Sequence, residues 1–149
     1  MDVYKITLAK WSKSLKTSGN PARWNSKKKY MIYTSGSRAL ACLENIVHRT
    51  GEGLNDAFKI MTIRIPGGIL IEEIKSSKLP PNWTNYKNYI HCQSIGDSWL
   101  DKVSSAVLKV PSAIIMNEYN YLINPAHADF KKIKLSKVED FKFDTRLKS

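Results

Sequence analysis

Three polar side chains in the first third of the chain could carry chemistry, namely Arg23, Tyr33 and Glu44. Residues 1–50 hold ten Lys and Arg against two acids, Asp2 and Glu44, and such a basic zone attracts phosphate groups or an acidic protein partner. Each of the three also has an ordinary structural use, as a stacked arginine, a half-buried tyrosine or a solvated glutamate. The pattern therefore indicates either a basic, solvated surface or a region of positive potential that attracts phosphates around one isolated carboxylate.

The elements that must position these residues can be expected from local composition. Residues 3–8 and 30–34 have the β-branched and aromatic composition of strands, and residues 14–21 that of a loop. A helix is predicted over residues 38–49, because apolar residues recur there at helical spacing after a capping serine. Glu44 lies at the edge of the apolar stripe of this helix, so we expect it to face a boundary between core and cleft.

The rest of the chain predicts further strands, one short helix and a loop. We expect strands at residues 58–65, 69–74, 106–110, 112–116 and 141–144, a short helix at 94–100, and a hydrogen-bonded loop at 117–127. Strands and helices alternate without an internal repeat, so the predicted fold class is α+β. A chain of 149 residues with 42% apolar residues is expected to form one domain, residues 1–149, with no need of disulfides or metal.

Several functional classes are disfavoured by absent motifs. The sequence contains no P-loop, no G-x-G-x-x-G, no G-x-S-x-G and no H-E-x-x-H pattern. Neither the cysteines nor the histidines have metal-ligand spacing, and the cysteines are expected to be small core residues. Without a signal-like or membrane-spanning apolar run, and without a disulfide framework, a cytoplasmic protein that contacts no membrane is expected. The residues concerned are Cys42, Cys92, His48, His91 and His127.

At this point the ordered motifs can be compared with a known family. The chain resembles the RES-domain toxins of RES–Xre toxin–antitoxin modules, over nearly its whole length and in the right order. One departure is the run Ser26-Lys27-Lys28-Lys29, which replaces a glycine-containing turn and puts the shape of the cleft rim in doubt. The motifs that carry the resemblance are Arg23-Trp24-Asn25, Tyr33-Thr34-Ser35, Ala39-Leu40-Ala41 with Glu44 and His48, Ile95-Gly96-Asp97, Val110-Pro111-Ser112 and Asn124-Pro125-Ala126-His127.

The resemblance implies a compact fold similar to ADP-ribosyltransferases, with small mixed or antiparallel sheets flanked by short helices. It implies an enzyme that depletes NAD as its substrate by cleaving the nicotinamide–ribose bond, as a glycohydrolase or, with inorganic phosphate, as a phosphorylase, without a metal. The alternative it leaves open is a protein ADP-ribosyltransferase. It also implies a cognate Xre-type antitoxin, an oligomeric toxin–antitoxin complex, and DNA contact only through that antitoxin.

The family's functional positions carry over to four residues. Glu44 would stabilise the oxocarbenium-like charge that builds on the ribose, and Arg23 would bind the diphosphate or ribose. Tyr33 would stack on the nicotinamide, and Ser112 would hydrogen-bond the ribose or the amide. The catalytic residues implied are Glu44, Arg23 and Tyr33, and the NAD-binding residues implied are Arg23, Tyr33, Ser112, Trp24 and Asn25.

One alternative from a different functional class remains open on the residues themselves. The basic N-terminal third could instead belong to a nucleic-acid-binding module, in which Lys28-Lys29-Tyr30 would supply charge and stacking. This reading ranks lower because the sequence contains no DNA-binding pattern. His48, Asn120, Asn124 and His127 are expected to satisfy buried polar groups and to take no part in the chemistry.

Overall fold

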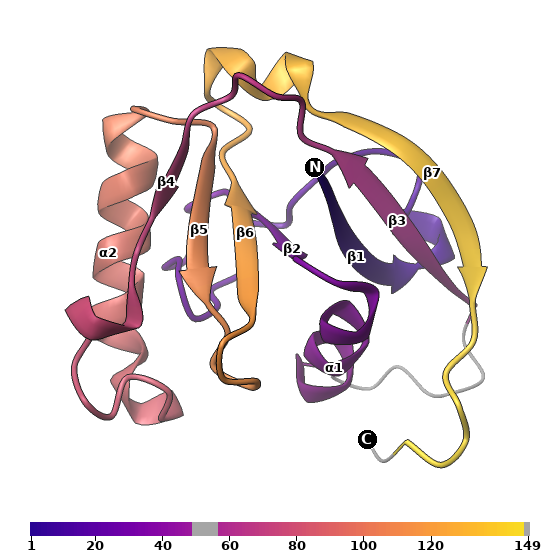
Figure 1. The fold of residues 1–149 in the computed structure, drawn as a ribbon, viewed down its shortest axis with the longest axis horizontal. Helices are drawn as coiled ribbons and strands as arrows, with labels where there is room; N and C mark the ends of the chain where they lie inside the picture. Colours follow the sequence, from indigo (N-terminus) through magenta and orange to yellow (C-terminus); the bar gives the residue numbers. More distant parts are fainter. Residues whose placement is uncertain (49–56, 148–149) are drawn as a thin grey trace.

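The computed structural model of the chain describes residues 1–48 and 57–147. In these residues seven strands form one mixed sheet in the order β4-β5-β6-β2-β1-β3-β7 (Figure 1). The strands are β1 (Asp2–Leu8), β2 (Ile32–Ser35), β3 (Phe58–Arg64), β4 (Ile71–Glu73), β5 (Val107–Pro111), β6 (Tyr119–Ile123) and β7 (Lys134–Phe141). The α-helices are α1 (Arg38–His48) and α2 (Tyr89–Lys102), and the 3-10 helices are η1 (Ala9–Trp11), η2 (Ser76–Lys78), η3 (Tyr86–Asn88) and η4 (Ala128–Lys132).

The sheet consists of two halves that meet at β1 and β2. All pairs are antiparallel except β4 with β5. β1 pairs with β3 along its full length, but it pairs with β2 only at Tyr4 and Ser35. The halves diverge from this junction, and α1 lies beside it (Figure 1). A short junction of this kind leaves the end of β2 accessible to side chains from α1.

Three apolar clusters hold the layers together. Ile6 of β1 and Ala41 of α1 belong to the cluster beneath α1, and Trp99 of α2 packs in a second cluster with Leu108 and Leu122 of the β4–β6 half. The third cluster contains Val3, Ile32 and Met61, which alternate with the residues that face the helices. Strand alternation therefore places both helices on one face of the sheet, and loops cover the other face.

The α+β class is confirmed, although several predicted boundaries were wrong. α2 spans Tyr89–Lys102 and is longer than the helix predicted over 94–100, because its buried positions recur at helical spacing over a longer stretch. Residues 112–116 do not form a strand, since the Ser112 hydroxyl accepts the N–H groups of Ile114 and Ile115 in a turn. The predicted loop contains β6, and the last strand is β7, not residues 141–144. The predicted helix end at residue 49 lies outside the described residues.

Candidate active site

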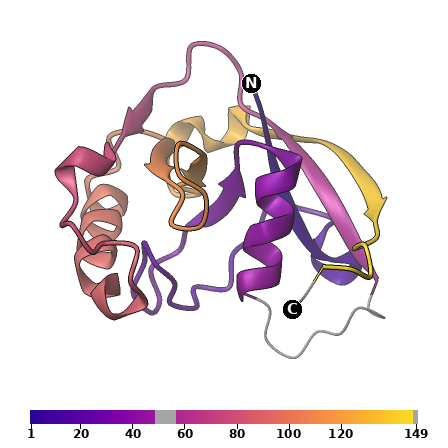
Figure 2. The same cartoon turned by 60° about the horizontal axis from the view of Figure 1, so that its bottom comes forward.

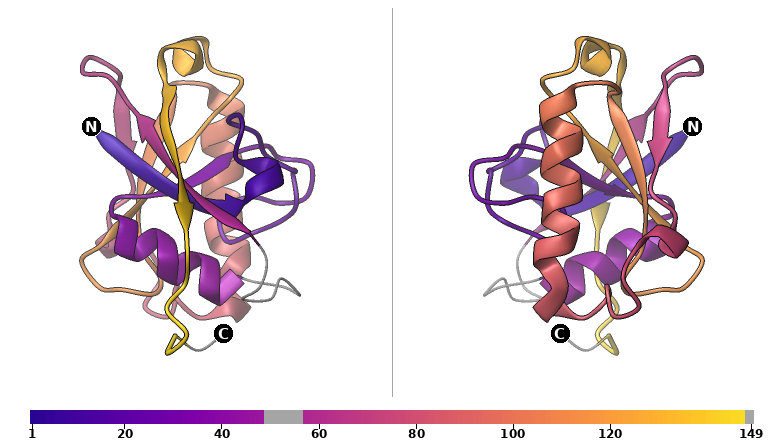
Figure 3. Two further views of the ribbon diagram at one scale, coloured as in Figure 1. Left: turned by 90° about the vertical axis from the view of Figure 1, so that its right-hand side faces the viewer. Right: turned by 90° about the vertical axis from the view of Figure 1, so that its left-hand side faces the viewer.

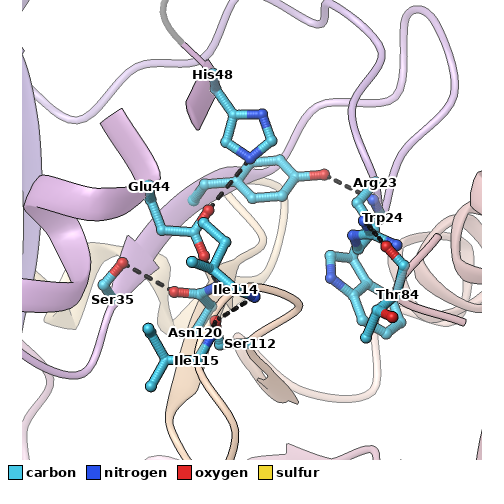
Figure 4. Close-up of polar contacts among 11 residues, drawn as sticks. Arg23, Trp24, Ser35, Glu44, His48, Thr84, Ser112, Ile114, Ile115 and Asn120 are labelled. Atoms are coloured by element: carbon cyan, nitrogen blue, oxygen red, sulfur yellow. Dashed lines mark hydrogen bonds and ion pairs between the residues drawn. The ribbon is translucent and has the colours of Figure 1, made fainter. Parts of the chain in front are cut away.

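Glu44 lies on α1, and its carboxylate contacts Asn120 of β6 and His48 of the same helix. Its Oε1 accepts a hydrogen bond from Asn120 Nδ2 at 2.7 Å, and Asn120 Oδ1 accepts one from Ser35 Oγ at 2.8 Å (Figure 4). Its Oε2 lies 3.2 Å from His48 Nε2, one helical turn along. The Glu44 side chain is 21% exposed and that of His48 is 53% exposed. The carboxylate is thus positioned at a rim, partly covered but still reachable from solvent.

Backbone pairing places these side chains together. Ser35 and Asn120 are register partners between β2 and β6, so their side chains leave the same face of the sheet. The next residue, Gly36, donates its N–H to Tyr119 O at 3.0 Å, and a Cβ at Gly36 would lie 3.1 Å from that oxygen. The close approach lets α1 begin directly after β2. Glu44 of α1 therefore reaches Asn120 at the start of β6.

Ser112 lies near this carboxylate, in the turn between β5 and β6. Its buried hydroxyl accepts the N–H groups of Ile114 and Ile115 at 3.0 and 3.1 Å, and its own N–H donates to Glu118 O at 2.8 Å. The hydroxyl oxygen is fixed by these two bonds, and its hydrogen is left to donate. Figure 4 shows Ser112 beside Asn120, and the turn lies between the two helices in Figures 1 and 2.

Arg23 makes a different set of contacts, on the other side of the close-up in Figure 4. Two of its guanidinium nitrogens donate to main-chain carbonyls, one to Trp83 O at 2.7 Å and one to Thr84 O at 2.9 Å. The guanidinium also stacks 4.5 Å from the centre of the Tyr89 ring. Arg23 is therefore anchored to the turn before α2, and some of its guanidinium N–H groups are already used in hydrogen bonds to the backbone.

Tyr33 connects β2 to the loop that carries Arg23. Its hydroxyl donates to Asn25 Oδ1 at 2.6 Å and accepts the N–H of Trp24 at 3.0 Å. Asn25 Nδ2 in turn donates to the carbonyls of Asn20 and Lys29, each at 2.9 Å. The Asn25 side chain therefore connects the two sides of the loop that carries Arg23. Burial raises the pKa of Tyr33 well above its usual range, so the phenol keeps its proton and remains a donor.

Side chains of helix α2 form hydrogen bonds with the loop that carries Arg23. Gln93 Nε2 donates to the carbonyls of Ala22 and Asn25 at 2.9 and 3.1 Å, and Asp97 accepts both the N–H and the hydroxyl of Ser26. At Gly96 an added Cβ would lie 1.7 Å from Trp24 O, so only glycine permits this approach. The loop that carries Arg23 is thus fixed on two sides, by β2 and by α2.

The structure brings some of the expected residues together and separates others. Glu44 and Ser112 lie in one cluster with Asn120. Arg23 lies in a second cluster. Tyr33 is connected to that second cluster because its hydroxyl accepts the N–H of Trp24, the residue after Arg23. Asn120 was assigned a structural role from the sequence, yet it holds Glu44 directly. The aromatic and β-branched residues Tyr119, Tyr121 and Ile123 are the signal that could have revealed a strand there, and with it the contact.

A separate hollow of about 740 Å³ lies on the outer surface of α2. Ser26, Ile90, Gln93, Asp97 and Asp101 line it, and none of them contacts Glu44. Asp101 forms an ion pair there with Lys29, one of the lysines that depart from the family pattern. The hollow therefore does not enlarge the surroundings of the Glu44 carboxylate.

Neither a metal site nor a membrane-spanning helix is present in the part of the chain that the structure describes. No three His, Cys, Asp or Glu side chains within residues 1–48 and 57–147 are grouped so that they could bind a metal ion. The expectation that no metal is needed remains a prediction. Neither α1 nor α2 is long and apolar enough to cross a bilayer.

The chain is similar in sequence to a known family and to curated proteins. The family model described as the RES domain matches residues 3–144. The chain is 38% identical over 127 residues to a "Prs ADP-ribosylating toxin" of Sphingobium sp. (strain YBL2), which covers 84% of this chain and 79% of that protein. It is 32% identical over 154 residues to a "Toxin Res" of Yersinia enterocolitica, which covers 99% of this chain and 100% of the relative.

A solved structure shows the same fold at lower sequence identity. The chain superposes on a protein in the crystal structure of the M. tuberculosis MbcT–MbcA toxin–antitoxin complex with a TM-score of 0.76 and 17% identity. The superposition covers 95% of this chain and 84% of that one. With the family model matching almost all of the chain and full-length relatives that are toxins, the chain belongs to the RES-domain toxin family.

Proposed function

We propose that this chain is the toxin of a toxin–antitoxin module and that it consumes NAD by breaking the bond between nicotinamide and ribose. The observation that supports this most directly is the Glu44 carboxylate, which is partly covered, fixed by Asn120 and still reachable from solvent. As nicotinamide departs with the electron pair of the broken C–N bond, positive charge builds on the anomeric carbon. A carboxylate already positioned there stabilises this charge more in the transition state than in the ground state.

The remaining residues have distinct parts in the proposal. Ser112 has a fixed hydroxyl oxygen and a free hydrogen, which suits a hydrogen bond to the ribose or to the nicotinamide amide. Tyr33 keeps its proton and presents an aromatic ring for stacking. Trp24 and Asn25 keep the Arg23 loop in shape through the Tyr33 hydroxyl. Arg23 retains N–H groups beyond the two used on carbonyls, and these are the ones proposed to meet a phosphate or ribose.

Three reactions share this bond cleavage and differ in the group that accepts the ADP-ribosyl unit. Attack by water at the anomeric carbon gives ADP-ribose, and attack by inorganic phosphate gives its 1-phosphate. Attack by a protein side chain gives a modified protein. The third reaction is a second candidate function, because the relative from Sphingobium, 38% identical, is described as an ADP-ribosylating toxin.

The proposal is tested by incubating the purified chain with NAD and measuring free nicotinamide and the second product by chromatography. Phosphate is varied, and labelled NAD is added in parallel to a cell lysate. We expect nicotinamide release, with ADP-ribose or its 1-phosphate as the other product. A labelled protein band without free ADP-ribose would support the transferase instead. Absence of all three products, with the chain folded by circular dichroism, would contradict NAD consumption.

For the partner we propose a cognate Xre-type antitoxin in an oligomeric complex, with DNA bound only through the antitoxin. The MbcT–MbcA complex, which shares the fold, was solved as a toxin bound to its antitoxin. We expect the antitoxin to suppress nicotinamide release in the assay above. The chain alone should not shift DNA in a gel at low salt. A shift with steep salt dependence would favour the nucleic-acid-binding alternative.

A further inference from the structure

A set of exposed lysines comes from η1, from the loop after it and from the turn that precedes β2. Between Asp2 and Glu44 the sequence contains no acidic residue, so no neighbour in this stretch offsets their charge. None of these lysines forms an ion pair with a described carboxylate. The set, called the lysine face below, consists of Lys10, Lys13, Lys16, Lys27 and Lys28.

The backbone of the lysine face is fixed by local hydrogen bonds and by packing on the sheet. The buried hydroxyl of Ser12 donates to a carbonyl of η1 at 2.7 Å, and Leu15 packs against the apolar cluster on that face of the sheet. The N–H of Lys28 donates to Gly19 O at 2.9 Å, which joins the turn at residues 26–29 to the loop after η1. The lysines are therefore presented on ordered backbone, which lowers the entropy lost when a partner binds.

The lysine face lies away from the candidate active site. η1 and the loop after it are on the side of the sheet opposite α1, the helix that carries Glu44 (Figure 3). The lysines of η1 and of this loop therefore do not surround the Glu44 carboxylate, and they are not placed to meet the phosphates of a dinucleotide bound there. Their charge is available to a separate partner.

An exposed aromatic ring lies among these lysines. Trp11 is 62% exposed, whereas the other three tryptophans of the chain are only 2%, 8% and 5% exposed. The Lys10 ammonium lies 5.2 Å from the centre of the Trp11 ring, so positive charge and apolar surface occur together at this point. This combination is typical of a protein interface, in which an aromatic side chain supplies contact area and the surrounding charges select the partner.

We propose that the lysine face binds an acidic segment of a partner protein, with an apolar side chain of that segment against Trp11. Carboxylates of the segment pair with ammonium groups that have no described carboxylate of their own, and the apolar side chain covers the exposed indole. Protein is favoured over nucleic acid for two reasons. No arginine of the face offers a planar donor fork to phosphate, and the lysines lie on a 3-10 turn and loops that cannot enter a DNA groove as a helix or strand would.

Quenching of tryptophan fluorescence by acrylamide tests this surface on the full chain. Because Trp11 is the only exposed tryptophan of the four, it should account for most of the quenching. The probe is a synthetic peptide of repeating Glu, Asp and Leu without tryptophan, and the same peptide with Gln and Asn is the uncharged control. We expect the acidic peptide to reduce quenching, with an affinity that falls as salt is raised, and the uncharged peptide to have no effect.

Removal of three charges from the lysine face should weaken binding of the acidic peptide about 5–20-fold. This variant combines Lys10→Gln, Lys13→Gln and Lys16→Gln. The matched control removes the same charge from exposed lysines in and beside η2 and η3, which are not part of the lysine face, and it should bind the peptide like the wild type. The control combines Lys75→Gln, Lys78→Gln and Lys87→Gln.

Equal weakening in the two triple variants would mean that net charge alone attracts the peptide, and it would overturn the proposal. Unchanged quenching of the wild-type chain by the acidic peptide would overturn it as well. If the first variant does not fold by circular dichroism, protection of Trp11 in the wild-type chain still decides the question. A single-stranded oligouridine that protects Trp11 and displaces the peptide would assign the lysine face to nucleic acid instead.

Discussion

The Glu44 side and the Arg23 side of the candidate site are held by opposite kinds of contact. Glu44 is fixed by side chains, through Asn120 and Ser35, and it lies at a partly open rim. Arg23 is fixed by main-chain carbonyls at Trp83 and Thr84 and by an aromatic ring. The first arrangement fixes a charged group that stays partly exposed, and the second ties one part of the backbone to another.

This difference predicts how substitutions divide between activity and stability. A change at Glu44 removes a group that few buried contacts depend on, so the fold should tolerate it. A change in the Arg23 loop releases contacts to β2 and α2 together, so it should lower both stability and activity. Substitutions at Glu44, Gly96, Asn120 and Tyr33 test this division, and we expect the largest effect at Glu44.

Glu44→Gln should give the largest loss of activity with little loss of stability. The amide keeps an oxygen for Asn120 but carries no charge, so we expect kcat for nicotinamide release to fall about 10²–10³-fold. The free energy of unfolding in urea should change by less than about 0.5 kcal/mol. Glu73→Gln, an exposed carboxyl on β4, is the control and should match the wild type. A Glu44→Gln variant with full activity would remove Glu44 from the site.

Gly96→Ala should damage the Arg23 side through the backbone. The new Cβ would lie 1.7 Å from Trp24 O, so α2 must move away from the loop, and we expect a loss of about 1–3 kcal/mol in the free energy of unfolding. Activity should fall as well, because the loop moves with Trp24. Gly67→Ala has no atom within 4 Å of its new Cβ and serves as the control in the same urea titration. Equal stability of the two variants would show that the loop can shift without cost.

Asn120→Ala should have a smaller effect, confined to the Glu44 side. It removes the hydrogen bond to Glu44, and we expect kcat to fall about tenfold, because a hydrogen bond to a charged group contributes about 1.5–3 kcal/mol. The KM for NAD should change little if Asn120 acts through Glu44. In a double-mutant cycle, Asn120→Ala should cost much less in the Glu44→Gln background. Equal losses in both backgrounds would show that Asn120 acts independently of Glu44.

How much of this could be predicted from sequence depended on whether the signal was local. Residues 3–8 and the helix beginning at Arg38 were recognised from composition and periodicity, and the structure has β1 and α1 there. The position of Glu44 at the edge of the apolar stripe followed from the same 3.6-residue period, and its partial exposure agrees. Elements of this kind are determined by neighbours in the chain, so one sequence is enough to find them.

The contacts that hold the site are not local, and the sequence did not reveal them. Asn120 and Glu44 are 76 positions apart, and Arg23 and Trp83 are 60 apart. The Asn–Pro step and small polar residues near 124 favoured a loop, which hid β6 and its register with Ser35. The resemblance supplied residue roles for Arg23 and others, but it could not show that part of the guanidinium is bonded to main-chain carbonyls. These roles remain proposals.

The last prediction uses Tyr33, whose hydroxyl belongs to the Arg23 side and responds to pH. Its pKa is raised in the folded chain by burial, while in the unfolded chain it should be near the ordinary value of about 10. Below that value the phenol is protonated in both states, and the stabilisation from its bonds to Trp24 and Asn25 is fully present. Above it the unfolded phenol ionises first, so the wild type should lose up to about 1.4 kcal/mol of unfolding free energy per pH unit.

Tyr33→Phe cannot ionise at this position, so it isolates the effect from the other tyrosines. The stability of the wild type should exceed that of the variant by a constant amount, about 1–2 kcal/mol, at pH 8 and 9. The gap should narrow as pH rises past about 10, because only the wild type gains stability in its unfolded state by losing this proton. Urea titrations of both proteins across this range measure the gap. A gap that stays constant to pH 11 would mean that Tyr33 ionises equally in both states, and that the Arg23 side is more open than the buried phenol implies.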